Sequence, residues 1–137
     1  MSQPIEPRKL LAMSPEEVLK FYPSMELDIW VFEKVLQGPF DIVEETRGAG
    51  AVPSFTRKFS DCYPLLIMAI MSCQKLEISA DEGNFVEAVS LGQLVRKNDI
   101  RTWRVRDGDI NGYGRTFPEA LAKFMICKTF DIRSPLK

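Results

Sequence analysis

Apolar residues recur at the spacing of one helical face through most of the first half of the chain. Ser14, Ser24 and Ser60 stand just before these stretches, and a serine side chain can accept a hydrogen bond from the first turn of a helix. The pattern predicts helices over residues 15–21, 25–37 and 60–75. The last of these contains a nearly continuous apolar run, so we expect it to be strongly buried.

In the second half of the chain the apolar residues alternate instead. In the clearest case Trp103 and Val105 fall on one side, and Arg104 and Arg106 fall on the other. Residues 81–84 have the composition of a hairpin turn. The pattern predicts three strands, at residues 76–79, 85–91 and 102–106.

The last third of the chain contains a glycine-rich segment followed by a helical signal. Residues 107–115 combine glycine with Asp and Asn, which predicts a loop. Thr116, with Glu119 three positions later, has the spacing of a capping box and predicts a helix that ends near Phe130.

Three consecutive strands with short connections favour an antiparallel meander, and the flanking helices can cover it. We therefore expect an α+β fold, an α-β-α sandwich with a small antiparallel sheet of about three strands. The length of 137 residues suits one domain. Residues 1–13 carry Pro4 and Pro7 and predict a flexible N-terminal arm, which leaves residues 14–137 as the single domain.

The amino-acid composition excludes several kinds of catalytic and metal-binding site. The chain has no histidine, which excludes Ser-His-Asp and Cys-His catalysis and imidazole-bound zinc. Its 18 basic and 19 acidic residues provide no overall basic field. Cys62, Cys73 and Cys127 are odd in number and form no Cys-x-x-Cys pair, so we expect free thiols in a reducing cytoplasm. No apolar run is long enough for a membrane span, and no signal-peptide pattern begins the chain. These features predict a cytoplasmic protein that needs no cofactor and is not an enzyme.

Asp107, Asp109 and Asn111, followed by Gly112, match the first half of an EF-hand calcium loop. The second half departs from the motif, because its twelfth position is Pro118 instead of a glutamate. A weak calcium site is one hypothesis for this segment, and a polar turn is the other.

Basic residues gather in the same part of the sequence, with Trp103 and Tyr113 among them. Arginines that point outward from a strand can contact phosphates, and an exposed aromatic ring can stack on a base. The opposite interpretation is a solvated strand face with local ion pairs. The candidate nucleic-acid-binding residues are Arg101, Arg104, Arg106 and Arg115.

Acidic residues form two further groups. Paired carboxylates can act as acid and base or hold magnesium only where they converge in space. Nothing in the sequence indicates convergence, so solvated loops are the simpler interpretation. The two groups are Asp41 with Glu44 and Glu45, and Asp81 with Glu82.

Several short motifs resemble those of the phage ABA-sandwich domain family, which includes NinX-type proteins. They are Leu27-Asp28 with Glu33-Lys34-Val35-Leu36, then Phe59-Ser60-Asp61 before a long apolar helix, and finally Trp103 followed by Thr116-Phe117-Pro118-Glu119-Ala120. The chain departs from the family at Cys62-Tyr63-Pro64, where relatives have Thr-Asp, alanines and a tryptophan. The resemblance implies an α-β-α sandwich encoded by phages or prophages, with no established activity and no catalytic residues.

Together these features predict a phage or prophage accessory protein in the cytoplasm of a bacterial host. We expect a non-enzymatic interaction module whose partner is a host or phage protein. The irregular residues 40–59 are the candidate contact surface, because long loops on rigid scaffolds often carry function. Nucleic-acid binding through the arginines is the alternative, and weak calcium binding is the third hypothesis.

Overall fold

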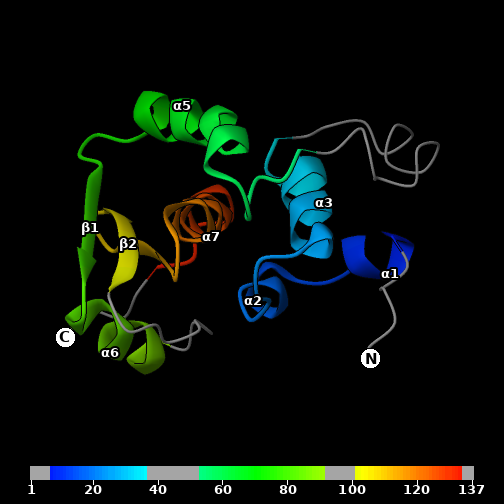
Figure 1. Ribbon diagram of the computed structural model, residues 1–137. Coiled ribbons are helices and arrows are strands. Elements are labelled where there is room, and N and C mark those ends of the chain that lie inside the picture. Colours follow the sequence, from blue (N-terminus) through cyan, green and yellow to red (C-terminus); the bar gives the residue numbers. More distant parts are fainter. Residues whose placement is uncertain (1–6, 37–52, 92–100, 134–137) are drawn as a thin grey trace.

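Helices come first in the chain, and the strands follow in its second half (Figure 1). The computed structural model describes residues 7–36, 53–91 and 101–133. Within these ranges the elements are α1 (Pro7–Leu11), α2 (Pro15–Val18), α3 (Met25–Lys34), the 3₁₀ helix η1 (Phe59–Asp61), α5 (Tyr63–Ser72), β1 (Glu77–Asp81), α6 (Gly83–Ser90), β2 (Thr102–Asp107), β3 (Ile110–Gly114) and α7 (Phe117–Thr129).

Local capping explains why the N-terminal helices begin where the sequence predicts. The Ser14 side chain accepts a hydrogen bond from Glu17 N at 3.2 Å, and the Glu17 carboxylate accepts one from Ser14 N at 3.3 Å. Ser24 caps α3 by accepting from Leu27 N at 3.2 Å. The expected flexible arm differs from the structure in one respect: its residues 7–11 form α1, and Leu10 is fully buried.

The three strands form an antiparallel sheet in the order β1-β2-β3, which confirms the expected α+β fold. Two of the predicted elements are nevertheless wrong. Residues 85–91 are not a strand, because residues 83–90 form helix α6. Residues 107–115 are not a loop, because β3 lies within them and pairs with β2, with Val105 opposite Gly112.

The sheet has helices on both faces. Helix α7 packs on one face, where Gly112 and Gly114 leave room for its backbone. Helix α6 lies on the other face, where Ala88 packs against the buried Tyr113. In Figure 1, α7 lies between the sheet and α3, and α6 lies at the lower end of the sheet.

A continuous core fills the space between the sheet, α7 and the N-terminal helices. Trp30 is 1% exposed, its ring contacts Phe130, and its indole N–H donates to the Met13 carbonyl. From the sheet side, Val105 is fully buried and Trp103 packs against Phe117 with ring centroids 5.6 Å apart. The inward placement of Trp103 and Val105 therefore agrees with their alternation in the sequence.

None of the helices within the described ranges combines the length and the apolarity that crossing a bilayer requires.

Burial of the Cys127 thiol predicts a loss of stability in alkaline solution. Burial in α7 raises the pKa of Cys127 from about 9 to about 12. Between these values the unfolded thiol ionises while the folded thiol keeps its proton, so the free energy of unfolding falls as pH rises. Below pH 9 the thiol is protonated in both the folded and the unfolded state, so its ionisation no longer lowers the free energy of unfolding.

Urea unfolding of the wild type and Cys127→Ala, below pH 9 and again between pH 9 and 12, measures this effect. The other two thiols and Tyr113 are present in both proteins and affect them equally, so the difference isolates Cys127. We expect the smaller loss of stability in Cys127→Ala. Equal losses in the two proteins would contradict the prediction.

Candidate interaction surface

The structure places the side chains of Arg104 and Arg106 in contacts within the fold. Arg104 on β2 is 19% exposed, and its Nη1 lies 3.5 Å from the Glu87 carboxylate of α6. The Tyr113 hydroxyl donates to the same carboxylate. Burial, together with this hydrogen bond, raises the pKa of Tyr113. Arg106 folds back on the hairpin turn, because its Nε donates to the Gly108 carbonyl at 2.7 Å.

The four arginines do not gather at one place. Arg101 and Arg115 are exposed and lie at the end of the sheet where β2 begins and β3 ends, while Arg106 lies near the opposite end. At ~3.3 Å per residue, Arg101 and Arg106 are about 16 Å apart along the strand. The arrangement does not form one basic groove, so it gives no specific support to nucleic-acid binding.

The candidate calcium ligands also point in different directions. Asp107 contacts Lys128 at 2.9 Å, and this hydrogen bond lowers the pKa of Asp107. Asp109 pairs with Arg133 at 2.7 Å. Asn111 is buried, and its register places it on the sheet face opposite to that of Asp107.

Residues 107–111 form part of a β-hairpin, since Asp107 closes β2 and Asn111 belongs to β3. Within the part of the chain that the structure describes, no group of three His, Cys, Asp or Glu side chains could hold a metal ion. The hairpin geometry does not favour the calcium hypothesis.

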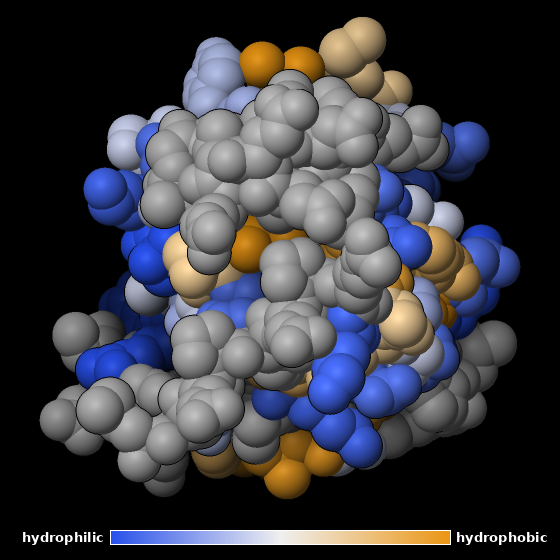
Figure 2. Space-filling model, turned by 90° about the vertical axis from the view of Figure 1, so that its right-hand side faces the viewer, coloured by the Kyte–Doolittle hydropathy of each residue, from blue (hydrophilic) through white to orange (hydrophobic). Residues whose placement is uncertain are grey.

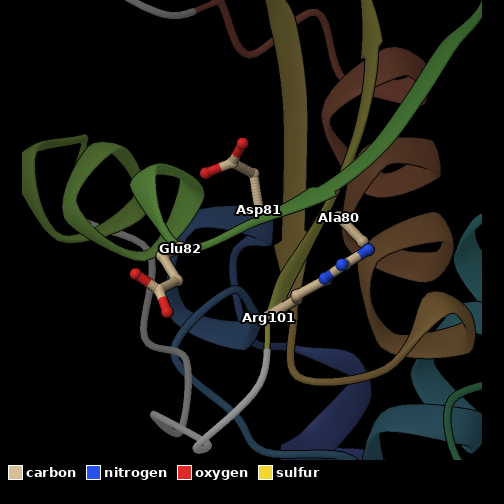
Figure 3. Close-up of a pocket in the computed structure, with 4 residues that line it drawn as sticks. All are labelled: Ala80, Asp81, Glu82 and Arg101. Atoms are coloured by element: carbon tan, nitrogen blue, oxygen red, sulfur yellow. The ribbon is translucent and has the colours of Figure 1, made fainter.

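An open pocket of about 390 Å³ lies where β1 meets α6, lined by Ala80, Asp81, Glu82 and Arg101. Figure 3 shows that the two carboxylates point to different sides and that the Arg101 guanidinium points away from both. Asp81 also accepts a hydrogen bond from Gly83 N at 2.8 Å. These acidic side chains do not converge, and the other acidic group, residues 41–45, lies outside the described residues.

Most of the predicted contact segment also lies outside the described residues, which resume at residue 53. The remaining part is fixed to α3. Asp28 accepts hydrogen bonds from Thr56 N at 2.8 Å and from the Thr56 hydroxyl at 2.6 Å, and it pairs with Arg57 at 2.9 Å. Burial raises the pKa of Asp28, and these donors oppose the shift. Residues 54–57 thus serve as an anchor on α3.

The feature that sequence reasoning missed is the outer side of α5. None of its ten residues is charged, and only Leu65 and Ala69 are buried. The expectation of a strongly buried helix is therefore wrong for the outer side of α5. We use the name α5 face for the exposed apolar side chains of this helix and the preceding turn, which are Phe59 (68% exposed), Tyr63 (62%), Ile67 (42%), Ile70 (60%) and Met71 (82%).

The α5 face is a single stripe. Tyr63, Ile67, Ile70 and Met71 recur at intervals of four, three and one, which places them on one side of a helix. Phe59 is held at one end of the stripe by ring contact with Phe117 at 5.7 Å. In Figure 1, α5 lies at the upper edge of the molecule, and apolar atoms project at that edge in Figure 2.

Comparisons with protein-family models, with curated proteins and with solved structures found no match to this chain.

Proposed function

We propose that this protein is an interaction module that binds another protein chain through the α5 face. The supporting observation is a helix with no charged residue whose outer side carries four large apolar side chains. Monomeric soluble proteins rarely expose contiguous apolar patches of this kind, and those that do usually bind a partner there.

The residue types fit this role. Aromatic residues and methionine are enriched at the centres of protein interfaces, where charged residues are depleted. Tyr63 provides a large ring, and Met71 provides a flexible side chain that adapts to the surface it meets. Each square ångström of apolar surface removed from water contributes about 25 cal/mol, so covering this stripe favours association.

The biological setting is a separate part of the proposal. The motif resemblance described above suggests a phage or prophage accessory protein that contacts a host or phage protein. The α5 face, which shares only Phe59 with residues 40–59, replaces that segment as the proposed contact surface, because its side chains belong to the described residues and are exposed.

Photo-crosslinking in cells tests the proposed surface. A photoreactive phenylalanine analogue at Met71, which is 82% exposed, should give a discrete adduct with a protein chain. The same group at Val86, an apolar residue of α6 that is 69% exposed, is the matched control and should give none. Ile70→Lys should remove at least about nine-tenths of the Met71 adduct, because it buries an unpaired charge at the contact.

The outcomes separate the hypotheses. An adduct at Met71 that Ile70→Lys removes supports the α5 face. Equal adducts at both positions, or no adduct at Met71, would contradict it. A nuclease-sensitive adduct would shift support to nucleic-acid binding.

A further inference from the structure

We infer that the outer edge of β1 binds an extended segment of another protein, which joins the antiparallel sheet as a fourth strand. This edge is a different surface from the α5 face, so the inference does not rest on the proposed function. Three features of β1 favour it: the direction of its outer backbone groups, the exposure of Ile78, and the charges at the two ends of the strand.

The hairpin between β2 and β3 determines which way the backbone groups of β2 point. Its turn has two residues, 108–109, so Asp107 and Ile110 on either side of the turn form a hydrogen-bonded pair. The direction of bonding alternates along a strand. Asp107 and every second residue before it therefore bond to β3, and the even-numbered residues from Thr102 to Arg106 direct their N–H and C=O groups to β1.

The register then fixes the direction of the backbone groups of β1. Glu77, Ser79 and Asp81 lie opposite those β2 residues and exchange hydrogen bonds with them. The N–H and C=O groups of Ile78 and Ala80 therefore point away from the sheet. Among the residues that the structure describes, no hydrogen bond reaches these outward groups. They present two donors and two acceptors at the spacing that an added strand requires.

The side chain of Ile78 is left half uncovered at this edge. Ile78 lies opposite the fully buried Val105, so it belongs to the face of the sheet that α7 covers, yet it is 45% exposed. In Figure 1, β1 lies at the left-hand edge of the sheet. Natural edge strands often carry a bulge, a proline or a lysine that discourages further pairing. The register of β1 is continuous and the strand contains neither residue, so the edge is open to a strand that would cover Ile78.

The charges at the two ends of β1 disfavour a second copy of this chain as the added strand. In the antiparallel register that joins all five β1 residues of two copies, Ser79 lies at the centre. Glu77 of each copy then opposes Asp81 of the other, and like charges directly opposite each other destabilise a strand pair. We therefore expect a segment of a different protein, with basic residues at the two positions that oppose these carboxylates.

Neighbouring basic side chains do not remove this preference. Lys75 lies 3.6 Å from the Glu77 carboxylate, but both side chains are exposed and such a pair is weak. Arg106, opposite Glu77 on β2, is turned toward the hairpin turn by its bond to a carbonyl there. The Arg101 guanidinium points away from Asp81 (Figure 3).

Nuclear magnetic resonance titration with a defined peptide tests the inference. The probe is Lys-Val-Thr-Val-Lys with blocked ends, whose valines align with Ile78 and Ala80 and whose lysines align with Glu77 and Asp81. We expect saturable binding at millimolar peptide that shifts the amide resonances of Ile78 and Ala80. Hydrogen exchange of these two amides should slow by at least about tenfold, because peptide carbonyls now accept from them.

N-methylation of the peptide distinguishes strand addition from other modes of binding. Methyl groups on both valine nitrogens remove the donors to the Ile78 and Ala80 carbonyls and should weaken binding by at least about tenfold. Methyl groups on the threonine nitrogen and the last lysine nitrogen, which point away from β1, are the matched control and should leave binding unchanged. Replacing both lysines by glutamate should also weaken binding, because it opposes acids to Glu77 and Asp81.

Ala80→Pro tests the same edge from the side of the protein. It removes one outward N–H and leaves the bonds between β1 and β2 in place, and proline is tolerated at such edge positions. The variant should remain folded by circular dichroism and bind the probe at least about tenfold more weakly. The methylated peptides use the wild type, so their result does not depend on this variant.

Weaker binding of the valine-methylated peptide alone would support the added strand. Equal binding of the two methylated peptides, or no binding of the probe, would overturn it. Amides of Ile78 and Ala80 that are as protected as Ser79 in the protein alone would show that the edge is already covered. Protection that rises with protein concentration would show that a second copy occupies the edge, and either result would overturn the inference.

Discussion

Gly112→Ala is expected to lower the free energy of unfolding by about 3 kcal/mol or more, which is a large part of the stability of a domain this size. A Cβ atom at Gly112 would lie 2.5 Å from Phe124 Cα and closer still to Phe124 N and Ala120 O. These are backbone atoms of α7, so no side-chain rotation can relieve the contact. The helix would have to move away from the sheet and disturb the core that it carries.

Urea or thermal unfolding monitored by circular dichroism measures this loss. Gly108→Ala is the matched control, because it changes the same residue type four positions earlier. A Cβ at Gly108 meets nothing within 4 Å, and its φ of 63° imposes only the cost of a left-handed backbone, about 1–2 kcal/mol. A smaller loss in Gly112→Ala than in Gly108→Ala would show that α7 does not lie this close to β3.

These glycines also show why the sequence suggested a loop where a strand exists. Glycine, Asp and Asn are typical of turns, and Gly108 does occupy one. Gly112 and Gly114 serve a different purpose, since they alternate along β3 on the side that faces α7. Alternating glycines produce no alternating hydrophobic signal, so the strand could be found only from the helix that packs on it.

Helix α6 could not be distinguished from a strand for a related reason. Residues 85–91 are a short, mainly apolar segment interrupted by Glu87 and Ser90, and such a segment fits either element. Tertiary contacts decide the outcome. Asn84 donates from its side chain to the Thr102 carbonyl at 2.9 Å, and Ala88 packs against Tyr113. Asn84 and Ala88 are four residues apart and so face the sheet from the same side of the helix. Their partners lie about 20 residues or more further along the chain, where a local pattern gives no information about them.

Three of the four predicted helix caps are correct, and the fourth, at Ser60, is wrong, because α5 begins at Tyr63 and has no side-chain cap. Ser14, Ser24 and Thr116 each accept a hydrogen bond from the first turn of the helix that follows. The α5 face had no such signal, because a helix of uniformly apolar residues gives no indication of which side is buried. The candidate sites at the arginines and at Asp107 were predicted from residues that lie close together in the sequence. The β-hairpin formed by β2 and β3 places the side chains of these residues at different ends and on different faces of the sheet.

Lys123→Ala is expected to have an effect of similar size, about 3–5 kcal/mol, because it leaves a carboxylate buried without its cation. Lys123 Nζ lies 2.7 Å from the Glu119 carboxylate, and the two side chains are 0% and 1% exposed. Burial lowers the pKa of Lys123, and the Glu119 charge opposes that shift. The same carboxylate accepts from Arg115 N at 2.9 Å, so Glu119 anchors the residue before the helix cap instead of completing a capping box with Thr116.

A double-mutant cycle separates the ion pair from simple loss of packing. Lys123→Met keeps most of the apolar volume of the side chain and should still be strongly destabilising, because the Glu119 carboxylate is left buried without its ion-pair partner. Adding Glu119→Gln should recover at least about 2 kcal/mol, since the amide can still accept from Arg115 N and no longer carries a charge. Urea unfolding of the four proteins gives the coupling energy. If the two single losses simply add in the double variant, the stability of this region comes from packing around α7 and not from the buried pair.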